Sequence, residues 1–191
     1  PDPHVRRWIR RQLETAPPRT PSLIITVWGD AIAPHGGAVM LSGLIALLAS
    51  VTTFAVGQAL RDSGVVCRRA ESYERSVVLA FVERLFPDWA DELRAGFAAV
   101  PPNVYIATEE GTLLGFACYN ATRPDYFGPT GVEASQRRRG IGRVLLLQCL
   151  EALRAQGYAY AIIGGVGPAE FYEKAAGATL IPASEPGIYR D

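Results

Sequence analysis

Beyond residue 64, apolar positions alternate between the spacing of helices and the short runs of strands. Residues 143–154 carry apolar side chains three and four positions apart, which predicts an amphipathic helix. Apolar runs on both sides of the polar turn Glu109-Glu110-Gly111 predict a β-hairpin. The pattern as a whole predicts strands at 65–70, 104–108, 112–119, 126–132, 158–163 and 179–182, and helices at 72–86, 88–98, 143–154 and through Phe171-Tyr172. This order indicates an α/β (α+β) domain over residues 65–191.

The first 64 residues form a different block, which we expect to be a separate, mainly helical module. A basic amphipathic helix is predicted at 5–13, and a proline-rich linker follows it. No Asp, Glu, Lys or Arg occurs between Asp30 and Arg61, and the apolar run 38–60 is long enough to cross a bilayer. Polar and glycine positions interrupt this run and favour two short helices with a break near 50–53 over a membrane span.

Composition narrows the class of protein. The chain has 191 residues, no formal net charge and 49% hydrophobic residues, as expected of a globular protein. Neutrality gives no general attraction to nucleic acid. The three cysteines, Cys67, Cys118 and Cys149, lie far apart in apolar stretches without a C-x-x-C pair. We therefore expect reduced thiols in a cytoplasmic protein, with neither a disulfide framework nor a metal site.

The most informative local feature is residues 136–142, here called the phosphate turn. It reads Gln-Arg-Arg-Arg-Gly-Ile-Gly and lies between a predicted strand and a predicted helix. Gly140 and Gly142 lack Cβ atoms, so a ligand can approach the backbone amides closely. Those amides begin a helix, where unpaired donors and the helix dipole favour an anion. The pattern alone equally allows a solvated arginine loop and an ordinary strand-to-helix turn.

Two signatures together resemble the GCN5-related N-acetyltransferases, the GNAT family. The phosphate turn is similar to the acyl-CoA motif of that family, with Arg137, Gly140 and Gly142 at its defined positions. Downstream, the aromatic pair Phe171-Tyr172 and a glycine turn are similar to its second signature. The resemblance covers about 65–191 and implies a mixed, mostly antiparallel sheet flanked by helices, which splays open between strands 126–132 and 158–163.

The GNAT resemblance implies acetyl-CoA as co-substrate and assigns residues to it. The pantetheine arm would pair with the backbone of strand 126–132, and the pyrophosphate would meet the phosphate turn. The implied binding residues are Gly131, Val132, Arg137, Arg138, Arg139, Gly140, Ile141, Gly142 and Arg143. Arginines 138 and 139 exceed what the motif needs, so one of them is expected to face solvent.

The same resemblance implies how the chemistry is divided among side chains. Tyr172 matches the position that commonly protonates the departing thiolate. Asp125 is our candidate for the base that deprotonates the amine, directly or through water, with Glu133 as the other nearby carboxylate; many relatives need no dedicated base. Acidic and aromatic side chains suit a cationic amine. Trp89, Tyr119 and Tyr189 are the expected acceptor contacts.

The N-terminal block has a resemblance of its own. Residues 21–48 resemble the winged helix-turn-helix of PaaX-type transcriptional repressors, through Thr26-Val27-Trp28-Gly29-Asp30 and the turn Pro34-His35-Gly36-Gly37. The recognition helix would then be 54–66, where Gly57, Gln58 and Arg61 are the available DNA contacts. Six arginines against four acids in this block give only a small positive charge for DNA phosphates. The alternatives are a module that packs on the other domain or forms a homodimer contact.

Two functions follow from these patterns. The first is an N-acetyltransferase that moves an acetyl group from acetyl-CoA to the primary amine of a small molecule by direct attack in a ternary complex. The second is a transcriptional regulator in which the module 1–64 binds DNA and the GNAT-like domain senses an acyl-CoA or another ligand. A membrane-tethered acetyltransferase is a third, less favoured reading, since we expect no membrane partner.

Overall fold

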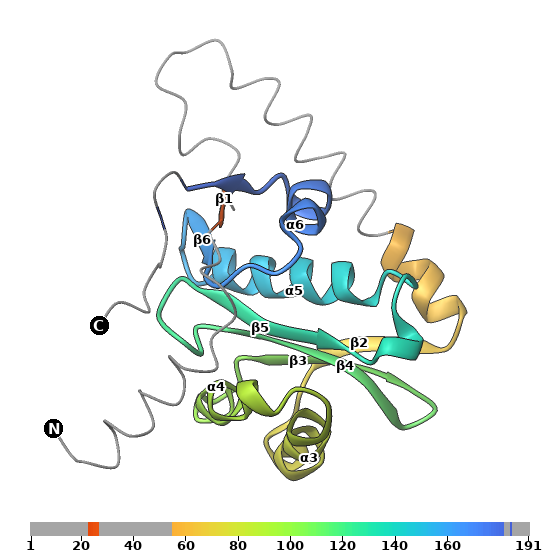
Figure 1. Ribbon diagram of the computed structural model, residues 1–191. Coiled ribbons are helices and arrows are strands. Elements are labelled where there is room, and N and C mark those ends of the chain that lie inside the picture. Colours follow the sequence, from red (N-terminus) through yellow and green to blue (C-terminus); the bar gives the residue numbers. More distant parts are fainter. Residues whose placement is uncertain (1–22, 27–54, 182–183, 185–191) are drawn as a thin grey trace, which may run out of the picture.

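The computed structural model of the protein describes residues 23–26, 55–181 and 184 (Figure 1). The strands are β1 (Leu23–Thr26), β2 (Val65–Arg69), β3 (Val104–Glu109), β4 (Thr112–Tyr119), β5 (Phe127–Val132), β6 (Tyr160–Ile163) and β7 (Thr179–Leu180). The α-helices are α3 (Arg75–Leu85), α4 (Ala90–Gly96), α5 (Ile141–Ala155) and α6 (Ala169–Ala176). Residues 55–62 are also helical, and short 3-10 turns lie at Ser72–Glu74, Pro87–Trp89 and Ala134–Gln136.

The strands form two sheets that meet at one point. Strands β2-β3-β4-β5 make a four-stranded antiparallel sheet, and β6-β1-β7 make a three-stranded one. Between β5 and β6 the structure describes a single parallel bridge, Tyr126 to Ile162. Beyond that bridge β5 pairs only with β4, so we call the divergence of β5 and β6 the splay. The predicted mixed, mostly antiparallel and splayed sheet is confirmed.

Helices cover both faces of the four-stranded sheet (Figure 1). Helix α5 lies on one face and the α3–α4 pair lies on the other. On the α5 side, Leu145, Leu146 and Leu153 are fully buried in one cluster of apolar side chains. On the opposite side, Val82, Leu93 and Phe116 are fully buried in a second cluster. The three- and four-residue spacing of apolar positions in 143–154 places one continuous face of α5 in this core.

Strand β1 comes from the block that the sequence assigned to a separate module. It pairs antiparallel with β6 from Leu23 opposite Ile163 to Thr26 opposite Tyr160. On its other edge, Leu23 pairs with Leu180 and Ile24 with Thr179 in β7. A domain boundary at residue 64 stays a prediction, but at least four residues before it belong to the sheet of the second domain.

The helical residues 55–62 also contact the second domain. Leu60 is 4% exposed and lies in the same apolar cluster as α5, and Val56 packs against that cluster. These residues fall within the predicted recognition helix 54–66. The predicted basic helix 5–13 and the first of the two helices expected within 38–60 lie outside the described residues.

Element boundaries differ modestly from the prediction. The predicted helices 72–86 and 88–98 each begin with a 3-10 turn before α3 and α4, and the second turn starts at Pro87. Helix α4 ends at Gly96, where an added Cβ would lie 2.9 Å from Val104 Cγ2. The chain therefore passes too close to β3 at this point for a larger residue.

Two further expectations concern the whole chain. Among the helices that the structure describes, none is both long and apolar enough to cross a membrane, although most of the run 38–60 lies outside them. All three cysteines are free, and Cys118 and Cys149 are buried. Burial raises the pKa of the Cys67 thiol to about 11 and that of Cys118 still further, so neither side chain is a ready nucleophile.

Candidate functional site

The phosphate turn connects β5 to α5, as its sequence predicts. Gly140 is the residue before α5 and has a φ of 88°, a left-handed conformation that favours glycine. No side chain among the described residues caps the N-terminus of α5. The first backbone N–H groups of this 15-residue helix are therefore available to donate hydrogen bonds to a ligand. The positive end of the helix dipole lies at the same place.

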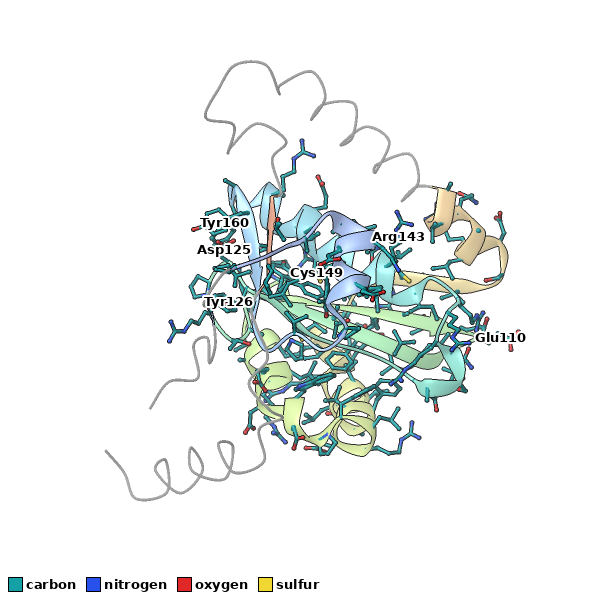
Figure 2. The ribbon with its side chains drawn as sticks, turned by 45° about the horizontal axis from the view of Figure 1, so that its top comes forward. Glu110, Asp125, Tyr126, Arg143, Cys149 and Tyr160 are labelled. Atoms are coloured by element: carbon teal, nitrogen blue, oxygen red, sulfur yellow. The ribbon has the colours of Figure 1, made fainter. Side chains whose placement is uncertain are left out.

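The four arginines of this region differ in their contacts. Arg137 Nε donates to the carbonyl of Val132 at 3.3 Å. Arg138 is exposed and has a φ of 66°. Arg139 donates to the Glu109 carboxylate at 2.5 and 3.2 Å and also to Gln136. Arg143, labelled in Figure 2, lies in the first turn of α5.

Of these arginines, Arg139 pairs with a carboxylate. Glu109 at the end of β3 uses both carboxylate oxygens on Arg139, and this hydrogen bonding lowers the pKa of Glu109. Arg138 is exposed, and no hydrogen bond or ion pair engages its guanidinium among the described residues. The sequence offered no sign that a glutamate 30 positions earlier would pair with the turn.

Gly142 lies between the phosphate turn and the second aromatic signature. An added Cβ at Gly142 would stand 3.7 Å from Phe171 Cζ and 3.7 Å from Val132 Cγ2. Helix α6 and the end of β5 thus flank the first turn of α5. A small residue at 142 keeps the backbone between them accessible.

Gly131 is covered from the other face of the sheet. An added Cβ there would stand 2.7 Å from Phe86 Cζ and 3.0 Å from Phe116 Cε1. The Phe86 ring stacks on Trp89, with centroids 5.3 Å apart. Phe86 therefore supports β5 at one of the predicted pantetheine positions. Sequence reasoning missed this role, because Phe86 carries no motif and only its place at the end of α3 brings it here.

Tyr172 lies on α6, against the start of β5. Its ring packs edge-on to Phe127 at 6.1 Å and to Phe171 at 5.0 Å between centroids. The residue is 7% exposed, and burial raises the pKa of its phenol to about 12. The hydroxyl therefore stays protonated near neutral pH, which is the state that a proton donor needs.

Asp125 lies immediately before Tyr126, at the bridge where the two sheets meet. Its carbonyl accepts a hydrogen bond from the Ile162 amide at 2.9 Å, and its own amide donates to Asn120 Oδ1 at 2.7 Å. Oxygen Oδ1 of Asp125 is buried and has no hydrogen-bond partner among the described residues. Burial raises the pKa of Asp125 to about 6. Figure 2 places Asp125 near Tyr126 and Tyr160, at the opposite end of the view from Glu110.

The three predicted acceptor contacts have different fates. Trp89 is 37% exposed at the start of α4 and stays available to a ligand. Tyr119 is 1% exposed, and its hydroxyl accepts a hydrogen bond from Arg69 at 2.5 Å. That side chain belongs to the core, because its ring packs beside Tyr105 and its polar atom is already satisfied; the expectation that it touches an acceptor is corrected. Tyr189 lies outside the described residues.

A hollow of about 470 Å³ lies beside the phosphate turn but has the wrong charge for pyrophosphate. Its lining includes Glu109, Glu110 and Glu133, together with Ser63, Gly64, Thr112, Leu114 and Gln136. Carboxylates repel a phosphate group, and only Glu109 is neutralised by an arginine. The lining of this hollow therefore does not suit an anion.

Comparison with solved structures supports the fold. A glucosamine N-acetyltransferase region of a fungal multi-domain GH3 β-N-acetylglucosaminidase matches with a TM-score of 0.60 at 14% identity, over 94% of this chain and 22% of that one. A GCN5-related N-acetyltransferase from Sphaerobacter thermophilus matches with a TM-score of 0.55 at 15% identity, over 91% of this chain and 53% of that one. The chain thus spans about a fifth of the first protein and half of the second. No curated protein matches the sequence.

Two family models match the sequence. One, described as PaaX-like protein, matches residues 19–60, where the PaaX resemblance was expected. The other, described as the acetyltransferase (GNAT) family, matches residues 70–178, which is more than half of the chain and includes the phosphate turn and Tyr172. The chain belongs to the acetyltransferase (GNAT) family.

Proposed function

We propose that the protein is an N-acetyltransferase that transfers an acetyl group from acetyl-CoA to the primary amine of a small molecule. The observation that carries the proposal is the uncapped start of α5 beside Gly142, in the same part of the fold as the buried phenol of Tyr172. Membership of an acetyltransferase family supports acetyl transfer in general. The donor, the acceptor class and the direct attack are our inferences.

The described residues suit the donor at two places. The amides of Gly140, Ile141, Gly142 and Arg143 would bind the pyrophosphate, because backbone donors at a helix start favour an anion. The exposed guanidinium of Arg138 would add charge-assisted hydrogen bonds. The outer edge of β5 at Gly131 and Val132, which pairs with β4 only on the inner side, would receive the amide groups of the pantetheine arm.

The proposed reaction has three parts: attack by the amine, breakage of the carbon–sulfur bond, and loss of a proton from the amine. The amine nitrogen, neutral, forms a bond to the thioester carbonyl carbon, and backbone amides of β5 stabilise the resulting oxyanion. The carbon–sulfur bond then breaks, and Tyr172 donates its phenolic proton to the thiolate. The amine loses one proton, so that an amide and free CoA thiol are the products.

Asp125 would take the proton that the amine releases. Its pKa near 6 leaves it mostly ionised at neutral pH, so it can act as a base there. The carboxylate also suits an acceptor that arrives as an ammonium ion, which must first lose one proton to solvent to become the neutral nucleophile. On the α3–α4 side of the sheet, Trp89 is 37% exposed and offers an aromatic surface to a cationic amine.

Turnover with a panel of small primary amines tests this function. We expect the full-length protein to release CoA thiol from acetyl-CoA only when an acceptor amine is present, and to form the acetylated amine in equal amount by mass spectrometry. Secondary alcohols of similar size serve as matched non-acceptors. Release of CoA without acetylated product, or no release with any amine, contradicts an N-acetyltransferase.

The PaaX-like match to residues 19–60 supports a second candidate, a regulator that binds DNA through this segment. Arg61 is exposed on the helical residues 55–62 and is the only arginine there. A salt-sensitive gel shift on DNA upstream of the gene, lost in Arg61→Ala and kept in Arg123→Ala, is the expected result for this function. Equal behaviour of the two variants, or no shift at all, rules it out.

A further inference from the structure

Strand β1 is what holds the second wall of the splay together. Within the described residues, β6 and β7 each pair with β1 and not with one another. All four residues of β1 have partners in β6, and two of them also have partners in β7. The wall that faces β5 across the splay is therefore a sheet only because a strand from the start of the chain completes it.

The other end of the same segment supports the phosphate turn. Val56 Cγ1 stands 3.0 Å from the position of a Cβ at Gly140, which is closer than ordinary van der Waals contact. Leu60, on the same side of the helical residues 55–62, is buried in one cluster with Ile141 at the start of α5. This short helix thus fixes the backbone from which the α5 amides point.

The exposed polar side chains of this helix form hydrogen bonds along it. Gln58 donates to Asp62 at 2.9 Å, and Arg61 donates to Gln58 at 2.9 Å. The apolar positions 56 and 60 are used by the acetyltransferase core. Both described parts of the PaaX-like match, β1 and the helical residues from 55, therefore pack against the domain that follows them.

We propose that strand β1 and the helical residues 55–62 together act as a clamp on the acyl-CoA site. Strand β1 completes the wall that contains β6, and helical residues 55–62 brace the phosphate turn of the opposite wall. A ligand that lies between these walls binds the docked form better, and by reciprocity its binding favours docking of β1. The identity of this ligand as acetyl-CoA rests on the proposed function.

Cross-linking in the full-length protein tests the docked strand without any ligand. Leu23 and Ile163 are Cα partners, so the pair Leu23→Cys with Ile163→Cys should form an intrachain disulfide under mild oxidant. The matched control joins Leu23→Cys with Tyr160→Cys, because Tyr160 lies opposite Thr26, three residues out of register. If the control pair cross-links at the same rate, or if neither pair cross-links, β1 is not docked as proposed and the clamp proposal is contradicted.

Linkage is tested by acetyl-CoA affinity and amide exchange. We expect Ile24→Pro, which removes an N–H from a strand paired on both edges, to weaken acetyl-CoA binding at least tenfold. Because that variant can fail to fold, Val56→Ser is paired with Ala59→Ser, an exposed position on the same helix. The first should weaken binding at least threefold and the second should leave it unchanged.

Saturating acetyl-CoA should also slow amide exchange in β1 and β6 of the wild-type protein at least threefold. Exchange that does not respond to the ligand, or a folded Ile24→Pro protein with wild-type affinity, overturns the linkage. If the wild-type protein binds no acetyl-CoA, the proposed function fails, and the cross-link alone decides whether β1 is docked. The two failures are therefore distinguishable.

Discussion

Arg139 of the phosphate turn donates two hydrogen bonds to Glu109 at the end of β3, at 2.5 and 3.2 Å. The tip of the β3–β4 hairpin is thereby joined to the turn that begins α5. Both side chains of the pair are about 30% exposed, so the ion pair adds little to stability. Its main effect is to fix the direction of the Arg139 side chain. Its neighbour Arg138 is exposed, and we propose that it contacts a phosphate of the ligand.

Arg138→Ala should weaken acetyl-CoA binding by about 10- to 150-fold, because a charge-assisted hydrogen bond to phosphate contributes about 1.5–3 kcal/mol and about 1.4 kcal/mol is a factor of ten. Titration calorimetry at two salt concentrations measures the effect, which should shrink at high salt. Arg123→Ala, in the exposed loop before β5, is the matched loss of one arginine. Equal losses in the two variants mean that Arg138 makes no specific contact.

Tyr172→Phe should lower kcat about 100-fold while leaving the KM for acetyl-CoA within about threefold, since the ring is kept and only the proton donor is lost. Its melting temperature should hold, because the phenol oxygen has no hydrogen bond that the structure describes, whereas the ring packs on Phe127. Steady-state kinetics and thermal unfolding measure these. A variant with wild-type kcat removes Tyr172 from the proposed chemistry.

Asp125→Asn should abolish the acid limb of the pH profile of kcat/KM, which we expect near pH 6 from the raised pKa of this carboxyl. Asparagine keeps the left-handed backbone at φ 69° accessible, so the fold should persist. Because burial disfavours the charged form, Asp125 costs stability as pH rises from about 4 through 6. The variant should therefore melt a few degrees higher at pH 7 and match wild type at pH 4. An unchanged acid limb assigns the titration to another group.

Gly140→Ala should destabilise the protein by about 1–2 kcal/mol, since a left-handed φ of 88° disfavours a side chain and the new Cβ would press on Val56 at 3.0 Å. Urea unfolding measures this loss. Gly140→Ala with Val56→Ala should recover part of it, which separates crowding from backbone strain. No recovery means that Val56 does not support the turn.

The sequence allowed the acetyltransferase half to be predicted because local chemistry determines its elements. The spacing of apolar residues in α5, the glycines of the turn and the aromatic pair on α6 each act within a few residues. Contacts made across the chain were not predictable in this way. Glu109 meets Arg139, Tyr119 turns inward to Arg69, and β1 pairs with β6, and no periodic pattern encodes any of these.

The N-terminal block shows the same limit. An apolar run such as Leu23–Thr26 is compatible with a strand in a separate module or in a distant sheet, because burial alone does not name the partner strand. Leu60 likewise fits the buried face of a recognition helix or the core beside α5. The resemblance to PaaX favoured the first choice, and the tertiary pairing places these described residues in the second.

Binding of acetyl-CoA to the full-length protein, measured by titration calorimetry in wild type, Gly142→Trp and Gly167→Trp, tests the central claim most directly. A tryptophan at 142 must occupy the space between Phe171 and Val132, whereas nothing lies within 4 Å of a Cβ at Gly167. We predict one acetyl-CoA bound per chain in wild type and Gly167→Trp, and at least a 100-fold weaker interaction in folded Gly142→Trp. No binding by the wild-type protein at millimolar acetyl-CoA, or equal binding by Gly142→Trp, contradicts an acyl-CoA site at the phosphate turn.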